Sequence, residues 1–225
     1  MGSEVYEPCD KAIKVLNRVS LKEFSKLKLA DFDRLSVIRT VRQMYKRLAK
    51  RAEQEYRKVA IEAYCFGFLM CEPDEIGIAM MAEKAITREW IREILEQTDF
   101  VTLYRFDTET ARKADRLIEA MAVVENSGEH GAALRNMKFN RNDQIDSALR
   151  LWAKQIGQYA INVTDYAILR AFEDAGVEEV EWVTEHDQRV CSHCHSMNGK
   201  RYKLENLPTK PHVNCRCTVR PILKK

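Results

Sequence analysis

The segment VCSHCHSMNGKRYKLENLPTKPHVNCRC, residues 190–217, holds four of the chain's seven cysteines and three of its five histidines. Its pattern is Cys191-x-x-Cys194, then seventeen residues, then His212-x-x-Cys215-x-Cys217. A Cys-x-x-Cys turn points two thiolates at one centre, and a second group of ligands arrives from further along the chain. This spacing predicts a structural zinc site that folds a small α+β module, because so short a segment has little core of its own.

Five side chains compete for the four positions of this site. The set that we favour is Cys191, Cys194, His212 and Cys215. An all-cysteine site that uses both Cys215 and Cys217 is the main alternative, and unligated reduced thiols are the other. The sequence alone leaves the choice between Cys215 and Cys217 open.

Other polar residues lie close to these ligands in the sequence. His193 and His195 alternate with the cysteines, and we expect them to point outward. Asp187 and Arg216 are the polar residues expected beside the metal. Asp187 either accepts a hydrogen bond from His212 or caps a turn, and we favour the second role.

The cluster lacks the features of a catalytic zinc site. A nucleobase deaminase needs His-x-Glu ahead of Pro-Cys-x-x-Cys, and a metalloprotease needs His-Glu-x-x-His, but neither pattern occurs in the sequence. Four protein ligands also leave no position open for a substrate water. Two alternatives of other classes stay open. One is a zinc-stapled nuclease of the His-Asn-His type, with His186, His193 or His195 as base, and the other is a host zinc-ribbon adaptor that binds nucleic acid.

Composition limits the class of protein further. The chain has 225 residues, 45% of them hydrophobic and 32% charged, which is enough for one large domain or two small ones. No segment has the apolar core of a signal peptide or the roughly 18–20 apolar residues that span a bilayer. We therefore expect no membrane and a reducing cytoplasm, where clustered cysteines are more often metal ligands or catalytic groups than disulfides. The scattered cysteines are expected to be buried, inert thiols: Cys9, Cys65 and Cys71.

Ahead of the cluster, apolar residues recur at spacings of three and four, which is typical of amphipathic helices. Three helices are predicted there, over about 32–67, 74–99 and 107–124. The segment 100–106 between the last two is either a short strand or a buried linker. The loop-forming segments 126–131 and 140–143 are expected to form a hinge.

A fourth, longer helix is predicted over 143–175, and Gly176 is a natural C-terminal stop for it. The alternation in VEEVEWVT, residues 177–184, then predicts a strand. Asn198-Gly199 predicts a type I′ hairpin turn, in which both central residues have positive φ.

These elements predict a mainly α fold in which long helices are followed by a small α+β module with a β-hairpin and a zinc knuckle. Residues 1–140 are expected to form a helical N-terminal region and residues 141–225 a C-terminal domain. Within that domain, the long helix is followed by the zinc-binding hairpin module at 177–225.

The formal net charge of +3 is small for a nucleic-acid binder, but its distribution is uneven. The polar face of the first predicted helix carries five cations: Arg39, Arg42, Lys46, Lys50 and Arg57. The tail from Lys200 onward is basic as well. The basic face is either a solvated surface that keeps the protein soluble, or a surface for phosphates or an acidic partner.

The C-terminal segment resembles a known family. Its motifs are Trp182-Val-Thr-x-x-Asp187-x-x-Val-Cys191-x-x-Cys194, then Asn-Gly199-Lys-x-Tyr202, then Pro211-His212-x-Asn-Cys215-Arg216-Cys217, followed by Pro221. In this order they are similar to the C-terminal signature of the phage head morphogenesis proteins, the Mu F-like minor head proteins. The resemblance covers roughly residues 145–222, and the first 140 residues fit the family only in being helical.

The resemblance implies a minor capsid component of a bacteriophage virion, without enzyme activity, that associates with the portal protein during procapsid assembly. Scaffold or major capsid protein are further partners to expect. The resemblance also implies assembly in the host bacterial cytoplasm, a final place inside the head near the portal and the DNA, and a contribution to DNA packaging and ejection. The residues themselves agree in offering basic faces for nonspecific DNA contact and a stapled module with no open catalytic position.

Overall fold

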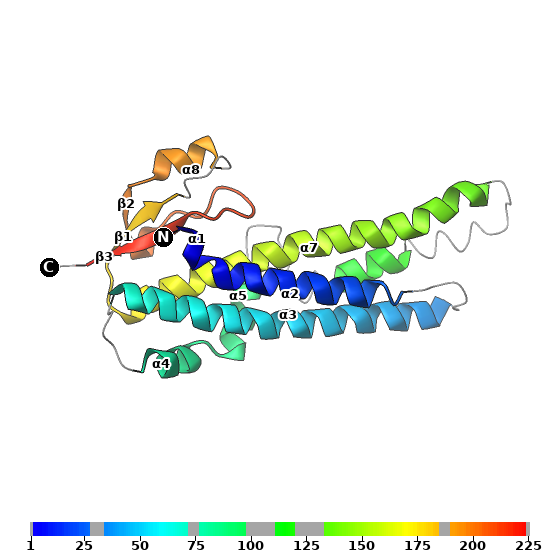
Figure 1. The fold of residues 1–225 in the computed structure, drawn as a ribbon, viewed down its shortest axis with the longest axis horizontal. Coiled ribbons are helices and arrows are strands. Elements are labelled where there is room, and N and C mark those ends of the chain that lie inside the picture. The colour runs from blue at the N-terminus through cyan, green and yellow to red at the C-terminus, as the bar shows by residue number, and fades with distance from the viewer. Residues whose placement is uncertain are drawn as a thin grey trace.

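In the computed structural model, three long helices form a bundle, and a small sheet with one short helix covers one end of it (Figure 1). The structure describes residues 2–27, 34–71, 77–97, 111–119, 133–184 and 190–223. After one turn at α1 (Gly2–Val5), the bundle helices are α2 (Glu7–Phe24), α3 (Arg34–Cys71) and α7 (Ala133–Asp174). In Figure 1, α3 and α7 run in the same direction and α2 runs in the opposite one. The predicted mainly α fold class is confirmed.

The core of the bundle lies along the apolar face that the sequence predicts for α3. From residue 41 onward that face is buried: Val41, Tyr45, Leu48, Ala52, Tyr56 and Val59. Tyr45 packs edge-on against Phe24 of α2 and Trp152 of α7, with ring centroids 5.9 and 5.5 Å apart. This aromatic contact joins all three helices. Leu35, which belongs to the same predicted stripe, is exposed.

A glycine lets α3 and α7 approach each other closely near the covered end of the bundle. A Cβ atom at Gly67 would lie 3.0 Å from the Cβ atom of Ala171 and 3.2 Å from the Cα atom of Ile168. A side chain at this position would therefore crowd α7, which would have to move away from α3 by a few tenths of an ångström.

The second predicted helix is in fact two helices, α4 (Ile78–Ala85) and α5 (Arg88–Gln97). The break follows Ile86, and the Thr87 hydroxyl accepts a hydrogen bond from the Trp90 N–H at 3.1 Å, which is a typical N-cap contact. The segment 100–106 lies outside the described residues. Residues 111–119, within the third predicted helix, are helical.

The long helix α7 begins at Ala133, earlier than the predicted start at 143. It therefore includes 140–143, which we predicted as one side of a hinge. A short polar run is compatible with a helix as well as with a loop, so this prediction was wrong. The other side, 126–131, lies outside the described residues. The predicted stop at Gly176 is confirmed: its φ is 70°, and the Val177 N–H donates to the Phe172 carbonyl at 2.9 Å.

Beyond α7, three antiparallel strands form a sheet in the order β2-β1-β3. They are β1 (Glu179–Val183), β2 (Arg201–Lys203) and β3 (Thr218–Ile222), with Val180 opposite Tyr202 and Pro221. Val180 and Trp182 are buried and Glu179 is exposed, so the alternation expected of a strand is confirmed.

The connection between β1 and β2 contains α8 (Ser192–Met197), and a 3-10 turn (Leu204–Asn206) follows β2. Asn198 and Gly199 form the predicted turn, since the Lys200 N–H donates to the Met197 carbonyl at 3.0 Å. The turn is of type II and not type I′, because Asn198 has φ −56° and only Gly199 has positive φ, 77°. A helix precedes this turn, so the twist that favours type I′ between two strands does not apply.

None of the helices in the described ranges combines the length and the apolar content that crossing a bilayer requires.

Candidate metal centre

Cys191 and Cys194 are brought together by the start of α8. Cys191 has an extended backbone and acts as N-cap, and its Sγ accepts a hydrogen bond from the Cys194 N–H at 3.3 Å. One helical turn then returns the Cys194 side chain to the same side. Cys194 is buried and Cys191 is half-buried. The Cys-x-x-Cys motif thus forms a two-thiol site at a helix N-terminus.

The loop at residues 211–217 supplies the other candidate ligands, and α7 holds this loop. The Cys215 N–H donates to the His212 carbonyl at 3.3 Å, and Asn214 between them has a φ of 58°, which asparagine adopts more readily than most residues. The Asn214 N–H donates to the Gln158 side-chain oxygen. Gln158 is itself fixed, because its amide nitrogen donates to the Asn162 side chain at 2.6 Å.

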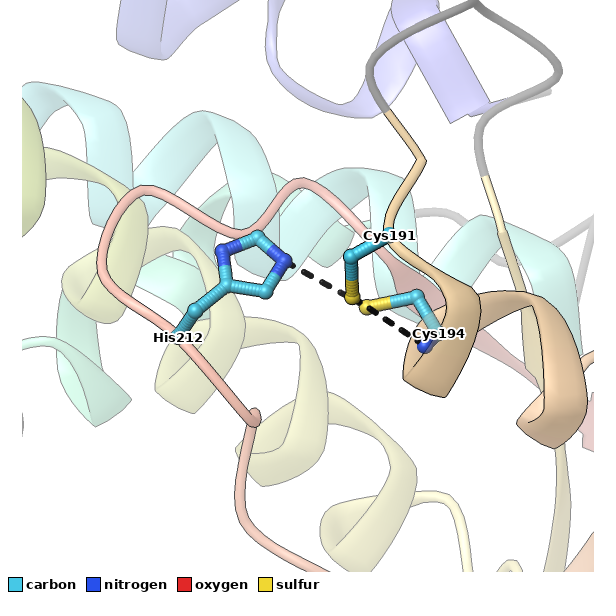
Figure 2. A group of neighbouring side chains, drawn as sticks. All are labelled: Cys191, Cys194 and His212. Carbon is cyan, nitrogen blue, oxygen red and sulfur yellow. Dashed lines mark hydrogen bonds between the residues drawn. The ribbon is translucent and has the colours of Figure 1, made fainter.

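The five predicted ligands form two groups that share Cys194. The first is Cys191, Cys194 and His212, and the second is Cys194, Cys215 and Cys217; within each group the ligand atoms lie within 4.8 Å of one another. Figure 2 shows the first group, with the His212 ring on its loop facing the two sulfur atoms at the start of α8. Either group could hold a metal ion.

The distances agree with ligands around one cation. The Cys194 Sγ lies 3.5 Å from the His212 Nε2 and 3.6 Å from the Cys215 Sγ. A tetrahedral ion with bonds of about 2.3 Å to sulfur and about 2.0 Å to nitrogen separates two sulfur ligands by roughly 3.8 Å, and a sulfur from a nitrogen by roughly 3.5 Å. The donors therefore lie almost where such an ion needs them.

The tautomer of His212 also suits a metal. Its Nδ1 lies 3.1 Å from the Val213 carbonyl oxygen, which can only accept, so Nδ1 carries the proton and donates it. The Nε2 lone pair then points toward the thiols, and the hydrogen bond to Val213 raises the pKa of His212. The carbonyl of Val213 thus takes the role that we considered for Asp187, which lies outside the described residues.

The thiols polarise one another. A hydrogen bond from Cys217 lowers the pKa of Cys215 to about 5, and the same contact raises the pKa of Cys217. Burial raises the pKa of Cys194 to about 12, whereas the hydrogen bond from the Cys194 N–H lowers the pKa of Cys191. The neighbouring groups therefore stabilise a thiolate at Cys215, the form in which cysteine binds metals.

Arg216 does not face the cluster. Its guanidinium makes a two-point contact with the Asp10 carboxylate of α2, with Nη1 to Oδ2 at 3.0 Å, and lies 5.8 Å from the centre of the Tyr6 ring. The hydrogen bond to Asp10 raises the pKa of Arg216. Arg216 therefore ties the ligand loop to the N-terminal helix.

A second contact between the same parts centres on the Tyr6 hydroxyl. It lies 2.6 Å from the Asp165 carboxylate and 3.0 Å from the Cys217 carbonyl, and it accepts a hydrogen bond from Lys210 at 2.6 Å. Lys210 also pairs with Asp165 at 2.5 Å and donates to the Cys215 carbonyl at 3.1 Å. Burial raises the pKa of Asp165 despite the ammonium beside it. We call Tyr6, Asp10, Asp165, Lys210 and Arg216 the N-terminal clasp.

The remaining predicted residues lie away from the cluster. His193 and His195 are exposed and belong to neither group of ligands, as expected, and His186 lies outside the described residues. Of the scattered thiols, Cys9 and Cys71 are buried and Cys65 is half-buried. Burial raises the pKa of Cys9 to about 12, which fits the inert role predicted for it.

The five cations predicted on the polar face of α3 are not equivalent. Arg57 donates to the Glu83 carboxylate at 2.5 Å and to the Ile86 carbonyl at 3.2 Å, so it braces α4. Arg42 pairs with Asp115 at 2.9 Å. Over the described ranges we find no ion pair for Arg39, Lys46 or Lys50.

These features define a helical-bundle protein whose C-terminal module carries a cysteine and histidine cluster able to hold a metal ion. Residues 114–220 match the family model described as phage Mu protein F like protein, which confirms the resemblance of the C-terminal sequence. This part of the chain is therefore similar to the Mu F-like head morphogenesis family, and residues 1–113 and 221–225 lie outside the match. No curated protein and no solved structure matches the chain.

Proposed function

We propose that the protein is a non-enzymatic minor head protein of a phage, which docks onto the portal during procapsid assembly and stays in the virion. The match of residues 114–220 to a head morphogenesis family is the observation that carries this proposal. The bundle supplies long, rigid contact surfaces, and the metal module fixes one end of it. A role in DNA packaging or ejection would follow from a position at the portal.

The portal contact can be tested by co-expression. The chain is produced with the portal protein of the same phage, and the complexes are separated by density-gradient sedimentation. Co-sedimentation at a fixed stoichiometry is the expected result. A chain that sediments alone, and that is absent from purified procapsids, would contradict the proposal.

We further propose that the metal is zinc, bound by Cys191, Cys194, His212 and Cys215. Three thiolates and one imidazole are a common set for structural zinc, and such closed sites leave no position for a substrate water. The close spacing of the donors and the tautomer of His212 support this set. Zinc would supply folding energy to the module and no chemistry.

Elemental analysis tests the zinc proposal. Purified wild type should contain about one zinc per chain, and the Cys191→Ser, Cys194→Ser double variant should contain little. A double variant of two thiols outside the cluster, Cys65→Ser with Cys71→Ser, is the control and should keep its zinc. A folded, reduced wild type without metal would refute this proposal and leave the portal proposal untouched.

A further inference from the structure

Three basic residues of α3, Arg42, Lys46 and Lys50, line a cleft that the sequence did not predict. This cleft, of about 580 Å³, lies between α3, α5 and residues 111–119. Its charged lining consists of five cations and two carboxylates, an excess of three positive charges: Arg42, Lys46, Lys50, Arg88 and Arg92, with Glu53 and Asp115. Ligands bind preferentially in concave sites of this size.

The two carboxylates form ion pairs with two of the five cations, and the other three cations can bind a ligand. Asp115 pairs with Arg42 at 2.9 Å, and Glu53 pairs with Arg92 at 3.3 Å. All five cations are exposed. In the described part of the chain, Lys46, Lys50 and Arg88 have no ion pair, so their charges face the solvent of the cleft.

The rest of the lining is mostly apolar. It consists of Ala49, Ala111, Ala114 and the buried Tyr45, together with the polar Gln54. Alanine side chains let another backbone approach the helices closely, and apolar floors with charged rims are typical of grooves that receive an amphipathic segment. The cleft therefore suits a ligand that is acidic on one side and apolar on the other.

Nucleic acid fits this lining less well. Proteins bind single strands by stacking bases on exposed aromatic rings, but the one aromatic residue of the lining, Tyr45, is 1% exposed.

We propose that this cleft is a docking site for an acidic amphipathic segment of a partner protein, with its carboxylates on Lys46, Lys50 and Arg88 and its apolar side chains on the accessible alanines, Ala49 and Ala111. The partner is defined here by its chemistry. The inference rests on the cleft and needs neither the zinc site nor the portal contact.

The test uses fluorescence anisotropy with the full chain. The probe is a labelled 16-residue peptide with leucine at positions i, i+3, i+4 and i+7 and glutamate elsewhere. We expect saturable binding that weakens at high salt, and at least tenfold weaker binding to Lys46→Glu, Lys50→Glu protein. A peptide with glutamine in place of glutamate should also bind at least tenfold more weakly.

The matched control is Lys14→Glu with Lys22→Glu on α2. Both lysines are exposed, and both double variants change the formal net charge equally, from +3 to −1. The control variant should bind the peptide like wild type. Equal losses in the two variants, or no saturable binding by wild type, would overturn the proposal. A result with nucleic acid would overturn it as well. This is the case if the Lys46→Glu, Lys50→Glu substitutions weaken binding of an oligonucleotide, single-stranded or duplex, more than they weaken binding of the peptide.

Discussion

At the residue level, the candidate metal centre has more thiols than a tetrahedral ion can use. Cys217 is buried and hydrogen-bonds Cys215, whose thiolate it stabilises. If Cys215 is the fourth ligand, Cys217 affects the metal only through its hydrogen bond to Cys215. Replacing a residue that hydrogen-bonds a metal ligand typically lowers the affinity for the metal by about 10–100-fold.

We therefore predict different effects of replacing these two thiols. Cys215→Ser removes a ligand and should leave the purified protein with less than stoichiometric zinc. Cys217→Ser should retain one zinc per chain, with affinity lowered by about tenfold. Competition with a chromophoric chelator measures both. The reverse order of the two variants would identify Cys217 as the ligand.

The candidate ligands could be predicted from the sequence because their spacing is local: two short motifs contain all five. The N-terminal clasp could not. The Tyr6 hydroxyl contacts the carbonyl of a residue 211 positions away, and nothing in the sequence around Tyr6, Asp10 or Asp165 distinguishes them from ordinary helix residues. Asn214 carries a weak signal, since asparagine is the residue type other than glycine that most often has positive φ.

At the level of elements, the contact of α3 with α7 depends on the absence of one side chain. Gly67→Ala should destabilise the protein by about 1–3 kcal/mol, because the new methyl group would have to displace the backbone of α7. Gly157→Ala is the control: its Cβ would meet the Asn214 side-chain oxygen at an ordinary 3.5 Å. It should be neutral, or stabilising by up to about 1 kcal/mol from helix propensity. Urea denaturation measures both, and similar losses in the two variants would contradict the close-packing argument.

The junction of α2 with α3 should depend on pH through Glu23. Burial alone would raise the pKa of this carboxyl, but hydrogen bonds from Lys26, at 2.5 Å, and from Arg47, at 2.7 Å, outweigh it and lower the pKa. A carboxyl whose pKa is lower in the folded state than in the unfolded state stabilises the fold fully at pH values above its unfolded-state pKa. This stabilisation is lost as the pH falls through its folded-state pKa.

Glu23→Gln should therefore cost about 0.5–1 kcal/mol at pH 7 and less at pH 3, where wild type has lost the same contribution. Urea denaturation at the two pH values measures the difference. Glu4→Gln, at an exposed position of α1, serves as the control and should show no such change. A cost that is equal at both pH values would assign the effect of Glu23 to packing.

Helices and strands differed in how well the sequence predicted them. The strand β1 and the stop of α7 were predicted correctly because alternation and a glycine are strong local signals. The break between α4 and α5 was missed, although Thr87 followed by a helical stretch carries an N-cap signal, because the apolar spacing continues through the break and conceals it. The turn at Asn198-Gly199 was assigned the wrong type because its sequence does not tell whether a strand or a helix precedes it.

For the whole molecule, the clasp connects the candidate metal centre to the bundle. Cys215 and Cys217 accept hydrogen bonds through their carbonyls from Lys210 and Tyr6, so a loop that loses its metal should also loosen α2. On the zinc proposal, chelation should speed hydrogen exchange of the first amides of α2, such as that of Asp10, by at least tenfold. The helix α5, which packs on α3 and α7, is the internal control, and its exchange should not change. Unchanged exchange in α2 would show that the clasp holds without metal.

The clasp also sets an order of events during synthesis. Tyr6 and Asp10 leave the ribosome more than two hundred residues ahead of their partners Lys210 and Arg216. The helices α2 and α3 can pair as soon as both have emerged, since their contacts are comparatively local. Tyr6, the residue just before α2, however, lacks Lys210 and the Cys217 carbonyl as hydrogen-bond partners until translation has passed residue 217. The nascent bundle therefore stays open at this end until the loop that carries Lys210 and Arg216 has been made.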